Sequence, residues 1–161
     1  MLDVPILIAW HSRTGASEAL ARAVHKGARG SALLVRADAV QPDHFLAAQA
    51  CVFVCPENLA TMSGEMKEMF DRCYYPVLGE VEGRAYASVI AAGSDGEGAQ
   101  RQLDRIVKGW RMRRIADPMI CNFAAQSEQS ILAQKAVPEN YLLACDQLGN
   151  TLKQGLEIGL F

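Results

Sequence analysis

The period of the apolar residues changes repeatedly along the chain, from that of a strand to that of a helix. Stretches at helical spacing begin near residues 16, 41, 62, 103 and 138. Short apolar runs, typical of strands covered on both faces, lie at 4–10, 31–36, 50–55, 85–92 and 115–121. Because strands that alternate with helices are joined by right-handed crossovers, the sequence predicts an α/β fold with a three-layer, doubly wound, five-stranded parallel sheet. We expect residues 1–161 to form a single domain.

Pro118 constrains the order of the strands. It lies within the fifth expected strand, and proline has no N–H to give to a neighbouring strand, so this strand is expected at an edge of the sheet. The second strand is short and polar at both ends, which also suits an edge. The order 2-1-3-4-5 places both strands at edges.

Charge and composition exclude several classes of protein. The net charge is −2, and 50% of the residues are hydrophobic, which favours a globular protein that does not bind nucleic acid. No apolar stretch is long enough for a membrane span. The N-terminus does not resemble a signal peptide, and five cysteines, an odd number, favour reduced thiols in the cytoplasm. Cys51 and Cys55 are expected on one face of a strand, as core thiols rather than as ligands of a metal.

Three polar loops follow strands one, three and four, at residues 11–17, 56–63 and 93–98. Ligands of doubly wound sheets bind at the carboxyl ends of the strands, beside the point where the strand order reverses, so these loops should converge. The first loop contains hydroxyl groups and a glycine and opens directly into a helix, which suits either a phosphate monoester or an ordinary helix cap. The motifs G-x-x-x-x-G-K-[ST] and G-x-G-x-x-G are absent from it, which favours a mononucleotide over a dinucleotide or triphosphate.

These loops resemble those of known flavin-binding families. HSRTGAS, at 11–17, resembles the phosphate loop of flavodoxin-like proteins. PENLATMSGEMKEMFDR, at 56–72, resembles the loop and helix of FMN-dependent NAD(P)H:quinone reductases and NADPH-dependent FMN reductases, and GSDGEG, at 93–98, resembles their third flavin loop. The match covers about the first three-quarters of the chain and implies a flavodoxin-like fold.

The resemblance implies a set of residues that bind FMN. The phosphate would be held by Ser12, Arg13, Thr14, Gly15, Ala16 and Ser17. The isoalloxazine ring would be bordered on one side by Pro56, Glu57, Asn58, Leu59 and Ala60. Its other edge would be closed by Gly93, Ser94, Asp95, Gly96 and Gly98. Because the flavin performs the electron transfer itself, no catalytic side chain and no metal ligand are expected.

The implied function is an FMN-dependent oxidoreductase that passes electrons from NAD(P)H to a quinone or another small acceptor. The second loop offers only Leu59, and the third has no aromatic residue, so the ring would stay open to a co-substrate, unlike the covered ring of a flavodoxin. Arg13 is unusual in a phosphate loop, and Glu57 adds a negative charge where quinone reductases have none. A flavodoxin-type electron carrier and a binding module without a cofactor therefore remain as alternatives. The resemblance also implies a homo-oligomer in which one subunit completes the pocket of another.

Three further features each have two interpretations. Lys108, Arg111, Arg113 and Arg114 are either a solvated helix end or a site for the 2′-phosphate of NADPH. His11 is either a solvated strand end or a ligand contact. The segment 123–137 is long for a connection and is expected to contain a short helix that shapes a substrate pocket or a subunit contact.

Overall fold

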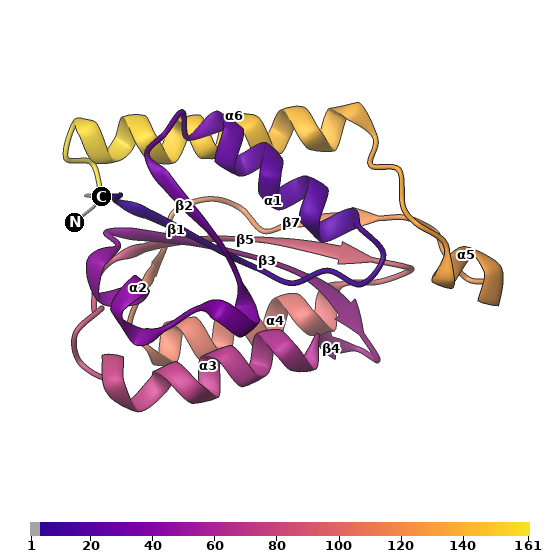
Figure 1. Ribbon diagram of the computed structural model, residues 1–161, viewed down its shortest axis with the longest axis horizontal. Coiled ribbons are helices and arrows are strands. Elements are labelled where there is room, and N and C mark those ends of the chain that lie inside the picture. Colours follow the sequence, from indigo (N-terminus) through magenta and orange to yellow (C-terminus); the bar gives the residue numbers. More distant parts are fainter. Residues whose placement is uncertain (1–3) are drawn as a thin grey trace.

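The computed structural model describes residues 4–161 as a parallel sheet between two layers of helices (Figure 1). The sheet has the order β2-β1-β3-β5-β6, with β7 also paired to β5 and the short strand β4 paired to β3. All pairings are parallel except that of β4, which turns back along the end of β3. The strands are β1 (Ile6–Trp10), β2 (Ala32–Arg36), β3 (Ala50–Asn58), β4 (Thr61–Met62), β5 (Ala85–Ala92), β6 (Arg113–Arg114) and β7 (Met119–Asn122). The predicted fold and strand order are confirmed, and β6 and β7 together occupy the fifth position.

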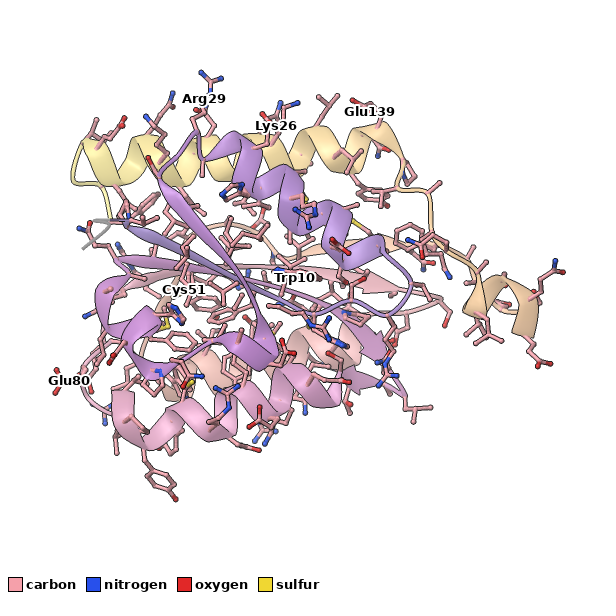
Figure 2. The ribbon with its side chains drawn as sticks, in the orientation of Figure 1. Trp10, Lys26, Arg29, Cys51, Glu80 and Glu139 are labelled. Carbon is pink, nitrogen blue, oxygen red and sulfur yellow. The ribbon has the colours of Figure 1, made fainter. Side chains whose placement is uncertain are left out.

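Side chains alternate between the two faces of the sheet, so both faces are buried. Along β3, Cys51, Phe53 and Cys55 enter one core cluster, whereas Val52 and Val54 enter the other. All five cysteines of the chain are free and buried, and Figure 2 shows Cys51 inside the protein beside α2. Burial raises the pKa of Cys51 and Cys55 to about 12. The prediction that these two are core thiols on one face is confirmed.

Two helices cover one face of the sheet, and three cover the other (Figure 1). The first face carries α1 (Ala16–Gly27) and α6 (Glu139–Glu157), and the second carries α2 (Pro42–Ala47), α3 (Gly64–Val77) and α4 (Glu97–Gly109), with a short 3-10 turn, η1 (Ala37–Ala39). The helices α1 and α6 pack backbone against backbone. A Cβ added to Gly27 would lie 1.9 Å from the carbonyl oxygen of Asp146, and one added to Gly149 would lie 2.0 Å from that of Val24.

Pro118 lies differently from the expectation. It is not inside a continuous strand but in the gap between β6 and β7, both of which pair with β5. Because the edge is interrupted there, no strand pairing needs the N–H that proline lacks. A second proline, Pro76, lies in the last turn of α3, which ends at Val77. So close to the end of a helix, a proline removes only a bond of the last turn.

The strands β1, β3 and β5 end at one edge of the sheet, here called the carboxyl edge. The helix α5 (Glu128–Leu132) also lies there, and Figure 1 shows it projecting beyond the rest of the fold. It confirms the expected short helix in the segment 123–137. Within residues 4–161, no helix combines the length and the apolar character needed to cross a bilayer.

Candidate functional site

The loop after β1 surrounds the N-terminus of α1. Gly15 precedes the helix with a φ of 86°, and its amide donates to Ser12 Oγ at 3.0 Å. The first hydrogen bond of α1 is the one that the amide of Ala19 donates to the carbonyl of Gly15. The amides of the first helical turn therefore have no partner within α1, and Gly15 has no side chain that could cap them. Such an N-terminus favours an anion.

The hydroxyl of Ser17 is the second feature of this loop that suits a phosphate. Ser17 is only 1% exposed, and its Oγ has no hydrogen-bond partner among residues 4–161. A buried hydroxyl without a partner costs about 1–3 kcal/mol. A phosphate oxygen at the end of α1 would satisfy both this hydroxyl and the free amides, so the residues present fit the phosphate of FMN.

Two residues that the sequence analysis did not single out complete this loop. The amide of Lys135 donates to the carbonyl of Thr14 at 2.8 Å. The side chain of Gln134 covers Gly15 so closely that a Cβ on Gly15 would lie 1.9 Å from its Nε2. They come from the segment between α5 and α6, and the unusual length of that segment was the only signal in the sequence.

The second loop is a tight hairpin rather than an irregular loop. After Pro56, β3 continues to Asn58, which pairs with Thr61 of β4. The two residues at the tip, Leu59 and Ala60, have φ values of 52° and 65°. Such a turn favours glycine or asparagine, so its backbone is strained here. Leu59 is 98% exposed.

The carboxylate of Glu57 joins the second loop to the third. Its Oε1 accepts from the amide of Gly96 at 2.9 Å, and its Oε2 accepts from that of Ala99 at 3.2 Å. Glu57 therefore caps the N-terminus of α4. The charge that the sequence analysis assigned to the flavin environment is directed into a helix end, where the helix dipole stabilises it.

Further contacts hold the third loop in place. The amide of Ala125 donates to the carbonyl of Gly93 at 2.7 Å, and Asn122 Nδ2 donates to the carbonyl of Ser94 at 2.5 Å. Asp95 Oδ1 accepts from the amide of Glu97 at 3.4 Å. Gly98 lies against the hairpin tip, because a Cβ there would be 2.1 Å from the carbonyl oxygen of Ala60.

Arg13 connects the first loop to the second. Its Nη2 lies 3.4 Å from Glu65 Oε1. With the Asn58 amide oriented to satisfy both of its ends, the Asn58 oxygen accepts from Arg13 Nε at 3.2 Å. Arg13 thus contacts both the hairpin and the first turn of α3. The structure brings all three predicted loops together at the carboxyl edge.

His11 is a buried link beneath these loops. It is 4% exposed, its Nδ1 is 2.9 Å from Ser63 Oγ, and its Nε2 is 3.6 Å from Glu65 Oε2. Burial lowers the pKa of His11 below 6.5, and the carboxylate of Glu65 opposes this shift only in part. The interpretation of His11 as a solvated strand end is wrong, because the side chain is buried against Ser63 and Glu65.

The basic cluster considered for a 2′-phosphate lies at the wrong end of the sheet. Arg113 and Arg114 pair with Ala85 and Tyr86, the first residues of β5, whereas the third loop follows the last residue of that strand. Arg114 is not solvated either, because it forms a mostly buried ion pair with Asp104 at 2.5 Å. Both interpretations of this cluster are therefore wrong for Arg114.

The comparison with protein families identifies the chain. Residues 42–125, more than half of it, match the model of the family described as NADPH-dependent FMN reductase. The chain belongs to this family. The matched region of this FMN reductase family member includes the hairpin and the third loop. The loop after β1 lies outside the matched region. The family indicates an FMN-binding oxidoreductase.

Solved structures share the fold of this FMN reductase family member at low sequence identity. A flavodoxin from the domain Archaea has a TM-score of 0.77 and 15% identity, over 94% of this chain and 98% of that one. A flavodoxin, WrbA-like protein from Agrobacterium tumefaciens has a TM-score of 0.69 and 17% identity, over 92% and 97%. The Flv1 flavodiiron core from Synechocystis sp. PCC6803 has a TM-score of 0.76 and 14% identity, over 98% of this chain and 37% of that one. The search of curated proteins gave no match.

Proposed function

We propose that this flavodoxin-like domain is an FMN-dependent oxidoreductase that passes electrons from NAD(P)H to a quinone or another small acceptor. The observation that carries the proposal is the unpartnered hydroxyl of Ser17 at the open N-terminus of α1. Membership of the FMN reductase family supports FMN as the cofactor and a nicotinamide donor.

In this proposal the loop from Ser12 to Ser17 holds the FMN phosphate. The free amides of the first turn of α1 and the hydroxyl of Ser17 donate to the phosphate oxygens, and the helix dipole stabilises its charge. Gly15 has no side chain to obstruct the phosphate, and Gln134 lies where a Cβ of Gly15 would be. Ser12 keeps the loop in shape through its bond to Gly15.

The flavin ring would lie between the hairpin of residues 56–60 and the third loop, 93–98. When bound, FMN would supply the two-electron chemistry between NAD(P)H and the acceptor. The chain contributes position and access. Glu57 fixes the spacing between the two loops, and Leu59 is the only large apolar side chain at the tip. Because neither loop contains an aromatic residue to cover the ring, a nicotinamide or quinone has room to stack on it.

The proposal is tested first by the spectrum of the purified protein after FMN is added. Bound flavin should absorb in the visible region, and NADPH should bleach it without air; a quinone should then restore the colour. A flavin that is bleached only through a separate reductase protein would instead indicate an electron carrier. Protein that takes up no FMN would support the binding module without a cofactor.

A pair of serine variants tests where the phosphate is held. Ser17→Ala should weaken FMN affinity roughly tenfold or more, the loss of one charge-assisted hydrogen bond, without lowering the unfolding temperature. Ser88→Ala is the matched control, because Ser88 is equally buried but bonded to Gln100 at 2.9 Å, far along β5 from the loops. It should lower the unfolding temperature and leave FMN affinity unchanged. Equal FMN affinity in Ser17→Ala and the wild type would contradict the placement.

A further inference from the structure

A groove lies between α3 and α4, on the helical layer that contains both. It consists of two adjoining hollows of about 570 Å³ and about 260 Å³. Both are lined by Lys67, Arg105 and Ile106, so they form one continuous groove. The larger hollow also includes Gly98 and therefore begins at the third loop of the candidate site.

The end of the groove near the loops is cationic. Arg101 and Arg105 lie one turn apart on α4, so both face the same side. Both are exposed, and neither has a carboxylate within ion-pair distance among residues 4–161. Lys67 is paired with Asp71 at 2.7 Å, so the groove has two cations left uncompensated. Paired guanidinium groups are well suited to phosphate.

The far end of the groove is aromatic. Tyr74 and Trp110 are stacked, with ring centroids 6.2 Å apart and an interplanar angle of 21°. Phe70 meets Trp110 edge-on at 5.4 Å. Because Trp110 is only 6% exposed and Phe70 is buried, these two rings support Tyr74 from the core, and the partly exposed ring of Tyr74 is the face open to a ligand. A planar, apolar ring would find a preformed surface there.

The order of these features along the groove matches the order of groups in a nicotinamide dinucleotide. The third loop comes first, at Gly98, then the two arginines, and then the aromatic end at Trp110. From Gly98 to Gly109 the helix rises about 16 Å. In NAD(P)H, the nicotinamide is likewise followed by phosphates and then by an adenine.

We propose that this groove binds the adenosine phosphate half of NAD(P)H. The phosphates lie at Arg101 and Arg105, the adenine lies at Tyr74 and Trp110, and the nicotinamide extends past the hairpin to the flavin. This inference rests on the proposed function, because the nicotinamide must reach the flavin that the proposed function places between the second and third loops. It replaces the basic cluster at Arg113 and Arg114, which lies at the other end of the sheet.

Two variants that remove one charge each from α4 test the groove. Arg105→Gln changes a groove residue, and Lys108→Gln is the matched control, because Lys108 is exposed on the same helix but does not line the groove. With FMN present, 2′,5′-ADP is titrated by calorimetry, and steady-state rates are measured with NADPH and with reduced nicotinamide mononucleotide, which lacks the adenosine half.

We expect Arg105→Gln to raise the Kd of 2′,5′-ADP and the KM of NADPH about tenfold, and to leave the KM of the mononucleotide unchanged. Lys108→Gln should change each value less than twofold. No binding of 2′,5′-ADP to the wild type, or equal effects of Arg105→Gln on both donors, would overturn the proposal.

The remaining outcomes separate this proposal from the proposed function. If neither donor reduces bound FMN, the proposed function fails, while the 2′,5′-ADP titration still reports on the groove. If Arg105→Gln converts a dimer into a monomer in sedimentation and leaves nucleotide binding intact, the groove is a contact between two copies, and the inference is wrong.

Discussion

Glu57 Oε1 accepts a hydrogen bond from the amide of Gly96 at 2.9 Å, which fixes the hairpin to the loop before α4. The other oxygen of the same carboxylate accepts from the amide of Ala99. One side chain therefore sets the spacing between two of the three loops of the candidate site. It also occupies the N-terminus of α4, whereas the N-terminus of α1 has no side-chain cap.

Removing this cap should loosen the third loop. Glu57→Ala should lower the free energy of unfolding by about 1–2 kcal/mol, the range found for lost helix caps, and should weaken FMN binding because the loop is no longer held. Urea denaturation and FMN titration measure the two effects. Glu97→Ala is the control, because Glu97 lies in the same helical turn and its side chain takes part in none of these contacts. Equal losses in both variants would show that the Glu57 contacts contribute nothing specific.

Gly15 should not tolerate a side chain. Gly15→Ala places a Cβ 1.9 Å from Gln134 Nε2 and requires a non-glycine residue at a φ of 86°. We expect a loss of about 1–3 kcal/mol in unfolding free energy and a large loss of FMN affinity. Adding Gln134→Ala removes the overlap but not the backbone strain, so it should restore only part of the stability in thermal unfolding. Full recovery would mean that the positive φ carries no cost.

Acidification should destabilise the protein through His11. Because burial lowers the pKa of His11 in the folded state below 6.5, the unfolded chain takes up this proton first as the pH falls. Stability is therefore complete above about pH 6.5 and decreases below it, by at most about 1.4 kcal/mol per pH unit for one group. His11→Asn should flatten this part of the profile in urea titrations between pH 7.5 and 5.5. His25→Asn should leave it in place, and a slope that survives His11→Asn would assign it to other groups.

The ion pair between Asp104 and Arg114 should be worth more than the pairs at the surface. Burial alone would raise the pKa of Asp104, but hydrogen bonds from Arg114, Tyr86 and Gln100 outweigh it and lower the pKa. Asp104→Asn leaves a mostly buried guanidinium without its anion and should cost about 3–5 kcal/mol in unfolding free energy. Glu157→Gln breaks the exposed pair with Lys153 and should cost about 0.5 kcal/mol or less. The two losses of unfolding free energy are measured by chemical denaturation. Similar losses in both variants would contradict the burial of the Asp104–Arg114 pair.

The sequence was sufficient for the features that depend on local pattern. The buried strands and the loops that follow them were predicted from apolar runs and from the position of Pro118, because the period of side chains follows directly from secondary structure. The sequence analysis missed contacts that depend on distant segments. Nothing near Thr14 shows that Lys135 will donate to it, and nothing near Arg114 shows that Asp104 will bury it.

The interior position of every thiol has a chemical consequence. Burial raises the pKa of Cys121 and Cys145 to about 12, as it does for the two cysteines of β3. Only the thiolate attacks electrophiles, and quinones are electrophiles as well as oxidants. A protein that passes electrons to quinones risks arylation by its own acceptor. The sulfur atoms here are buried and their pKa is raised, so a quinone acceptor of the proposed function would not inactivate the protein through its thiols.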